Sequence, residues 1–490
     1  MPSTPSSSPR QSSLNRQILA LAVPAFGALI AEPLLVLADS AIVGHLGSAP
    51  LAGLTLGSTV VQTLVGFMVF LAYSTTPAVA RAVGAGDTPS AFAAARNGLW
   101  VAAGLGVFFG VLLTLTAGPL LGALGASGDV LAHATAYLLP SLAGLPGMLL
   151  VLAATGALRG FQDAKTPLYV ATVGAALNVP LSWALVYPAG WGVAGSAVAT
   201  AVVQWGMALA LTYAVVARTR APGSLARPSG LSVRTRVPGW LPDLAGLKAV
   251  FRVGAWLMVR AACLRISLLA TVFVVTSQGE KNLAAYQLTM AFFNLLAFAL
   301  DALAIAAQAL LGKEMGAQNL STRQGQGAVV QLKNRLVRWS LAFGLVTALV
   351  CPAVGFGLAW VFTPDPEVQR LFALSLLVLA VGQPLAAYVF ILDGVLIGAQ
   401  DVRYLGLAGL FTLVAYLPVL AGLYVWFGAG AGAGADAPAP LAGGTSWAWG
   451  GLLDGPTLAY LLLWCSYALW YMGARALTLG LRARSGVWVA

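Results

Sequence analysis

The chain has 490 residues, of which 59% are hydrophobic and only 8% are charged. Soluble domains carry roughly 25% charged residues, so this composition excludes a water-soluble protein and indicates a polytopic membrane protein. A formal net charge of +11 also occurs in nucleic-acid-binding proteins, but the positions of the basic residues, described below, argue against a nucleic-acid partner.

Apolar runs long enough to cross a bilayer recur along the chain, since about 20 residues suffice for one crossing. Twelve spans are predicted, six on each side of a linker rich in Pro, Arg and Gly. The predicted spans are 16–43, 51–80, 95–119, 131–155, 166–187, 193–217, 247–275, 283–311, 331–360, 368–395, 403–427 and 455–478. The expected division is a polar tail (1–15), an N-lobe (16–217), a cytoplasmic linker (218–246), a C-lobe (247–478) and a C-terminal tail (479–490).

The basic residues indicate the orientation of these spans. With both termini in the cytoplasm, all of the 26 Lys and Arg residues lie on the cytoplasmic side except Arg260, Arg265, Lys281 and Arg370. Cytoplasmic loops of membrane proteins are enriched in Lys and Arg, so this orientation is favoured. We therefore expect a multi-pass protein of the plasma (inner) membrane with cytoplasmic N- and C-termini.

Two carboxylates interrupt the first predicted span. Asp39 follows Glu32 by seven residues, so both side chains lie on one helix face, about 10 Å apart along the axis. An ionised carboxylate at bilayer depth costs roughly 2.5–3.5 kcal/mol, and such groups normally face an ion or substrate path. Pro24 and Pro33 flank Glu32, and each removes a helical hydrogen bond and favours a bend. The alternative is a pair of acids that only holds neighbouring helices together.

The fifth and sixth predicted spans carry polar groups at helical spacing. Asn178 and Ser182 are four residues apart and share a helix face, and Thr200 and Gln204 repeat this spacing. Their oxygen atoms are donors of the kind that bind a small cation or a protonated carboxyl group. Hydrogen bonding between helices without a ligand is the alternative role.

The two halves of the chain are similar in sequence. The aligned segments are 46–56 with 278–288 and Gly84–Ala85 with Gly316–Ala317, both at an offset of 232, and 158–163 with 396–401 at an offset of 238. Because each half holds an even number of spans, both halves have the same orientation and are related by an axis along the membrane normal. Parallel repeats of this kind are typical of transporters, whose pathway lies at the repeat interface.

The second half has intramembrane charges of its own, at Arg260, Arg265, Asp301 and Asp393. Buried charges generally pair with one another, and Asp393 with Arg260 is one possible pair. The sequence leaves open whether these residues stabilise the lobe or take part in transport.

The chain has no sequence feature of a catalytic centre. Its three cysteines fall within apolar spans, which argues against a disulfide framework. It has no HExxH, GxSxG or Walker-type motif. We therefore expect no enzymatic activity, no resident metal and no cofactor.

Several segments, in this order, resemble the multidrug and toxic compound extrusion (MATE) family. They are Pro24, LADSAIVGHLG around Asp39, GALRGFQDAKTP and Leu177–Asn178, and ILDGVLIGAQDVRYL resembles the DinF-like branch. The resemblance covers about residues 15–480. It implies a V-shaped, all-α fold of twelve transmembrane helices in two six-helix lobes related by a pseudo-two-fold axis. Such proteins export organic cations or other amphipathic compounds in exchange for inward H⁺ or Na⁺.

The resemblance also implies roles for individual residues. Asp39 matches the N-lobe coupling carboxylate, Pro24 the bending proline, and Asn178 and Thr200 further positions of the cation site. The family pattern has a second aspartate where this chain has Ser182. The loss of that charge favours H⁺ over a Na⁺ ion held by Asp39, Asn178 and Thr200, unless Glu32 replaces the missing carboxylate.

The sequence thus predicts a secondary antiporter that works by alternating access, as a monomer in the lipid bilayer, on a small-molecule substrate. H⁺ is the expected coupling ion and Na⁺ the alternative. The alternative function is a flippase for lipid-linked sugars or polysaccharides from the same broad superfamily, which usually has more cationic residues in its central cavity. A membrane-embedded enzyme or a channel fits the acidic, proline-containing helix and the duplicated lobes less well.

Overall fold

The computed structural model describes residues 9–220, 240–428 and 455–489, which are almost entirely helical and contain no strand. The helices of the first half are α1 (Pro9–Gly44), α2 (Ser48–Met68), α3 (Phe70–Gly84), α4 (Thr88–Ala123), α5 (Gly128–Gly160), α6 (Lys165–Val186) and α7 (Gly192–Arg220). Those of the second half are α8 (Leu244–Thr276), α9 (Glu280–Ala317), α10 (Arg323–Gly357), α11 (Ala359–Phe362), α12 (Pro366–Gly398), α13 (Val402–Leu423), η1 (Tyr424–Gly428), α14 (Gly455–Cys465), η2 (Ser466–Tyr471), α15 (Met472–Ser485) and η3 (Val487–Val489).

Eleven helical segments in the described ranges are long and apolar enough to span a membrane, with α2 and α3 together forming one of them. The predicted span 455–478 coincides with three contiguous pieces, α14, the π-helical turn η2 and α15. The last crossing is therefore segmented, and no single piece of it is long enough to qualify as a spanning helix.

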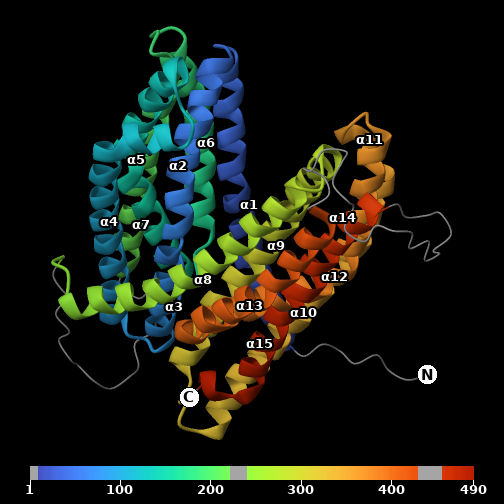
Figure 1. Cartoon of the computed structure of the whole chain (residues 1–490). Coiled ribbons are helices and arrows are strands. Elements are labelled where there is room, and N and C mark those ends of the chain that lie inside the picture. Colours follow the sequence, from blue (N-terminus) through green and yellow to red (C-terminus); the bar gives the residue numbers. More distant parts are fainter. Residues whose placement is uncertain (1–8, 221–239, 429–454, 490) are drawn as a thin grey trace.

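Figure 1 shows these helices as two lobes, α1 to α7 and α8 to α15, which diverge at one end of the molecule and meet at the other. The all-α, V-shaped architecture predicted from the sequence is thus confirmed. We call the two ends of the V the open end and the closed end. The turn between α3 and α4 lies at the closed end.

Side chains that accept backbone hydrogen bonds fix the start of several helices. Asp87 accepts from the N–H of Ser90 at the start of α4, and Asp243 accepts from Ala245 and Gly246 at the start of α8. Free N–H groups in a first helical turn need such partners, because the helix itself supplies none. The residue just before each of these helices therefore determines where it begins.

The internal duplication recurs in the helix packing. A Cβ added to Gly156 would lie 2.7 Å from the carbonyl oxygen of Ala72, and one added to Gly394 would lie 2.5 Å from that of Ala304. These residues are related by the two offsets found in the sequence, 238 and 232. Only glycine allows backbones to approach so closely, so equivalent helix pairs pack in the same way in both lobes.

Hydrogen bonds join the lobes at the closed end. Arg81 Nη2 donates to the carbonyl oxygen of Ala399 at 3.3 Å, and Gln162 Nε2 donates to that of Ala309 at 3.0 Å. Gln162 has a positive φ of 64°, as does its repeat equivalent Gln400 at 63°. The duplicated segments 158–163 and 396–401 therefore form the same turn, and in the first lobe this turn reaches across to the second.

Candidate functional site

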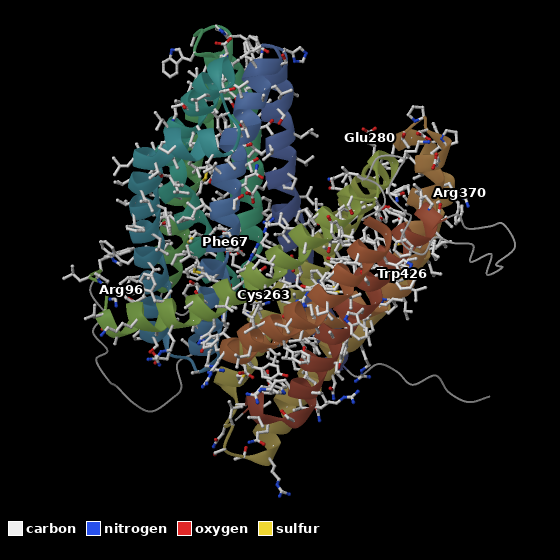
Figure 2. The ribbon with its side chains drawn as sticks, viewed as in Figure 1. Phe67, Arg96, Cys263, Glu280, Arg370 and Trp426 are labelled. Carbon is white, nitrogen blue, oxygen red and sulfur yellow. The ribbon has the colours of Figure 1, made fainter. Side chains whose placement is uncertain are left out.

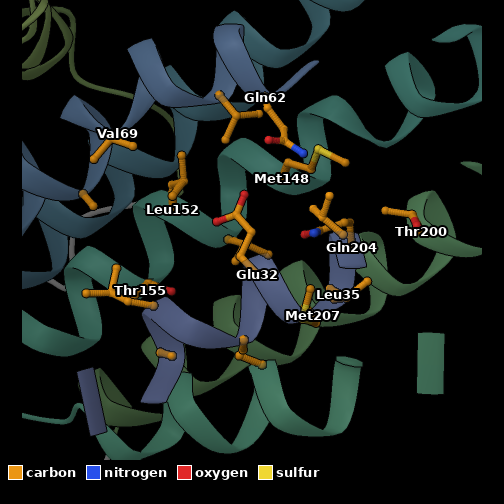
Figure 3. Close-up of a pocket in the computed structure, with 18 of the residues that line it drawn as sticks. Glu32, Leu35, Gln62, Val69, Met148, Leu152, Thr155, Thr200, Gln204 and Met207 are labelled. Atoms are coloured by element: carbon orange, nitrogen blue, oxygen red, sulfur yellow. The ribbon is translucent and has the colours of Figure 1, made fainter. Parts of the chain in front are cut away.

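A cavity of about 250 Å³ lies among α1, α2, α3, α5, α6 and α7, and Ile305 of α9 also lines it (Figure 3). Its volume is close to the lower end of the range for ligand-binding cavities, about 300–1,000 Å³. Most of its wall is apolar. The polar and charged lining residues are Glu32, Asp39, Ser58, Gln62, Tyr73, Tyr137, Thr155, Arg159, Thr200 and Gln204.

Asp39 is the centre of a hydrogen-bond network in this wall. Its carboxylate is 5% exposed and accepts from Ser182 Oγ at 3.0 Å and from Thr200 Oγ1 at 3.2 Å. Asn178 Nδ2 in turn donates to Thr200 Oγ1 at 3.0 Å. The structure thus brings together one acid from α1, two residues from α6 and one from α7, all of which were singled out in the sequence.

Ser196, which was not predicted from the sequence, completes this group. It is fully buried on α7, one helical turn before Thr200, and lies beside the Asp39 carboxylate. Ser196 Oγ and Asn178 Oδ1 are both buried without a hydrogen-bond partner in the described part of the chain. Buried polar atoms normally have partners, so these two oxygens have free capacity to accept a hydrogen bond from a protonated carboxyl group or to coordinate a small cation. The spacing of four residues between Ser196 and Thr200 was the available signal.

Glu32 stands apart from the network. Its side chain is exposed within the cavity and points into it in Figure 3. Among the described residues it makes no hydrogen bond to Asp39, Asn178 or Thr200. It is therefore a second acid of the cavity, and no hydrogen bond among the described residues joins it to the network around Asp39.

The two prolines of the first predicted span both lie within α1. Pro24 is buried and Pro33 is exposed. The helix continues through both positions from Pro9 to Gly44, although neither proline can donate the usual backbone hydrogen bond. The two positions at which α1 lacks a backbone hydrogen bond thus lie on the helix that carries Glu32 and Asp39.

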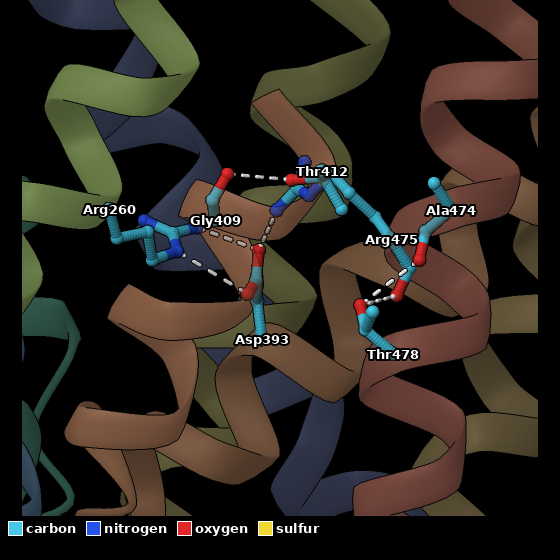
Figure 4. A network of polar contacts seen from close by, with 7 residues as sticks. All are labelled: Arg260, Asp393, Gly409, Thr412, Ala474, Arg475 and Thr478. Atoms are coloured by element: carbon cyan, nitrogen blue, oxygen red, sulfur yellow. Dashed lines mark hydrogen bonds and ion pairs between the residues drawn. The ribbon is translucent and has the colours of Figure 1, made fainter. Parts of the chain in front are cut away.

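Three charged residues of the second lobe form a different network (Figure 4). Asp393 accepts from Arg260 Nε at 3.3 Å and Nη2 at 2.7 Å, and it also pairs with Arg475 of α15. Arg475 was not singled out in the sequence, because it lies near the end of the last predicted span. Arg265 is exposed, and its guanidinium lies against Gly66 of α2. Asp301 is half-buried and has no hydrogen bond or ion pair among the described residues.

The MatE family profile matches residues 24–184 and 257–421, once in each lobe. The chain belongs to the MATE family. It is 28% identical over 425 residues to the protein DETOXIFICATION 44, chloroplastic, of Arabidopsis thaliana, covering 84% of this chain and 75% of that protein. It is 26% identical over 380 residues to DNA damage-inducible protein F of Escherichia coli (strain K12), covering 77% and 79%.

Solved MATE structures have the same fold. The Vibrio cholerae MATE transporter VcmN in the bent form superposes with a TM-score of 0.77 at 20% identity and covers 97% of this chain and 98% of that chain. MATE proteins are ion-coupled membrane transporters and not enzymes. This MATE protein is accordingly a multi-pass efflux transporter that carries small molecules across a lipid bilayer.

Proposed function

We propose that this MATE transporter exports organic cations or other amphipathic compounds in exchange for H⁺, and that Asp39 carries the proton. The observation behind this proposal is the surroundings of Asp39. Its carboxylate is buried, lines the cavity and is bonded only to neutral groups in the described part of the chain. A buried acid with a permanent cationic partner would stay ionised, whereas this one can gain and lose a proton.

The composition of the site favours H⁺ over Na⁺. Ser182 stands where the family pattern has a second aspartate, so the network around Asp39 contains a single carboxylate. The remaining groups, Asn178, Ser196 and Thr200, are neutral. Oxygen donors of this kind also bind Na⁺, which remains the alternative coupling ion.

Protonation of Asp39 would couple to the lobes through α1. A neutral Asp39 no longer attracts the hydroxyl protons of Ser182 and Thr200 as strongly, which loosens the contact of α1 with α6 and α7. Pro24 gives α1 a place to bend in response. Two arrangements of the lobes, each favoured by one protonation state, then expose the cavity alternately.

The energy of one proton suffices for export. A proton entering down 100 mV yields about 2.3 kcal/mol, and each favourable pH unit adds about 1.4 kcal/mol. A tenfold concentration of a neutral solute costs about 1.4 kcal/mol. One proton per substrate without net charge therefore supports a gradient of tenfold or more, and export of a monovalent cation is driven by the pH difference alone.

The distribution of charge supports an orientation with the closed end in the cytoplasm. Figure 2 shows Arg96 near the closed end, and Glu280 and Arg370 near the open end. Most of the other Lys and Arg residues belong to the loops and helix ends that were assigned to the cytoplasm from the sequence. With the plasma (inner) membrane as the proposed location, the V then opens to the outside.

Proteoliposomes test this proposal. Purified protein is reconstituted and substrate flux is followed under a pH gradient without Na⁺, and then under a Na⁺ gradient at equal pH. Saturable flux that follows the pH gradient and stops on addition of an uncoupler is expected. Flux that follows only the Na⁺ gradient, or that an uncoupler leaves unchanged, would overturn H⁺ coupling.

A further inference from the structure

The cavity contains a buried cation that the proposed antiport does not use. Arg159 lies one residue before the end of α5, is 7% exposed and lines the cavity. Its Nε is buried without a hydrogen-bond partner. No hydrogen bond or ion pair is made by its side chain to any residue in the described ranges. A buried guanidinium normally has an anionic partner, because its desolvation is otherwise uncompensated.

The charges near Arg159 do not supply that partner. Asp301 is the carboxylate that interacts electrostatically with it, yet the two residues form no ion pair. Asp301 also interacts with Arg260 and Arg475, and Asp393 is already bonded to both of these arginines. Among the described residues this group therefore has three guanidinium groups and two carboxylates, and Arg159, the member that lines the cavity, is the one without an ion pair.

A second hydrogen-bond donor lines the same cavity as Arg159. Tyr73 of α3 also lines the cavity and interacts electrostatically with Arg159. Its hydroxyl group makes no hydrogen bond within the described residues. A guanidinium and a phenol together form a donor pair suited to a carboxylate or another small anionic group.

The opposite charge lies farther along the same cavity. The Glu32 carboxylate points into the space beside Leu152 of α5 in Figure 3. Arg159 follows Leu152 by seven residues, which is roughly 10 Å along the helix axis. A ligand of moderate size can therefore reach both charges, and the wall between them is mostly apolar.

We propose that Arg159 and Tyr73 bind an anionic group of the transported compound, so that the cavity takes zwitterionic amphipaths with the cationic group directed toward Glu32. This inference rests on the proposed export function and specifies its substrate class. It does not depend on the coupling ion, because it concerns the residues that bind the substrate and not those that bind the proton.

A pair of dyes that differ in a single charged group tests the inference. Rhodamine 110 carries a free carboxylate, and rhodamine 123 is its methyl ester. Binding of each dye to the purified full-length protein is measured at equilibrium without any ion gradient, so failure of H⁺ coupling cannot affect the result. The wild type should bind rhodamine 110 more tightly, and Arg159→Gln should weaken that binding about tenfold or more while leaving rhodamine 123 binding unchanged.

Two further variants separate recognition from a structural role. Arg159→Lys keeps the charge and should retain part of the preference for the carboxylate dye. Asp301→Asn removes the competing carboxylate and should keep or increase the preference. Equal binding of both dyes by the wild type would overturn the inference. An equal weakening of the binding of both dyes in Arg159→Gln would also overturn it. So would a selective weakening of rhodamine 110 binding in Asp301→Asn, since Arg159 would then act through Asp301.

Discussion

Gly84 of α3 and Gly316 of α9 occupy equivalent positions in the two repeats, and each lies against the backbone of the other's helix. A Cβ on Gly84 would be 1.9 Å from the carbonyl oxygen of Lys313, and a Cβ on Gly316 would be 1.9 Å from that of Arg81. This crossing joins the two lobes at the closed end. The two glycines are related by the repeat offset of 232 and make equivalent contacts, as expected for lobes related by a pseudo-two-fold axis.

Replacement of either glycine by alanine should weaken this crossing. The atom in the way belongs to backbone and cannot rotate aside, so the helices must separate, at a cost of about 1–3 kcal/mol. We expect Gly84→Ala and Gly316→Ala to unfold at a lower temperature in detergent and to transport more slowly. Gly104→Ala is the matched control, because a Cβ there meets nothing within 4 Å. Equal unfolding temperatures in all three variants would contradict the role of the crossing.

The charge at position 182 should determine the choice of coupling ion. Ser182→Asp restores a second carboxylate beside Asp39, and two acids with neutral oxygen ligands favour Na⁺. We expect Na⁺ to stimulate flux several-fold in this variant and to have little effect on the wild type. Ser182→Asn, which adds a side chain of similar size without charge, should behave like the wild type toward Na⁺. If Na⁺ does not stimulate flux in Ser182→Asp, the charge at position 182 does not determine the coupling ion.

Asp393 should contribute to the stability of the second lobe. Asp393→Asn leaves Arg260 and Arg475 without their carboxylate, and loss of one member of a buried ion pair costs about 3–5 kcal/mol. The unfolding temperature should fall markedly and should recover in part when Arg475→Gln is added. If the double variant is no more stable than Asp393→Asn alone, the network does not act as a stabilising ion group.

Pro24 should be needed for fast export, because it removes a backbone hydrogen bond of α1 on the N-terminal side of both acids. Pro24→Ala restores the missing hydrogen bond and stiffens the helix. We expect export to slow at least several-fold while substrate binding is retained. Pro119→Ala, in an exposed position within α4, is the control and should transport normally. An unchanged export rate in Pro24→Ala would show that bending at this position is not needed.

Much of the fold was predictable from the sequence, because bilayer thickness sets the length of apolar helices and loop charges set their direction. The repeat offsets also anticipated which helices pack equivalently, as Gly156 and Gly394 illustrate. The segmented last crossing was not predicted. The π-helical turn η2 lies in an apolar run whose composition does not differ from that of a regular helix.

The site was predictable in part. The spacing of polar residues within apolar spans identified Asp39, Asn178, Ser182 and Thr200. Their hydrogen bonds form because α1, α6 and α7 pack side by side. Arg159 was missed as a cavity residue, because a basic residue at a helix end has the pattern of a topology signal. Its burial depends on how α5 meets α3 and α9, which no local pattern encodes.

Substrate-induced proton release is the most direct test of Asp39 as the coupling site. Substrate is added to purified protein in a weakly buffered, Na⁺-free solution, and the released protons are measured with a pH indicator. The wild type and Glu32→Gln should release about one proton per bound substrate, and Asp39→Asn should release none. Undiminished proton release from Asp39→Asn, with substrate still bound, would contradict the account.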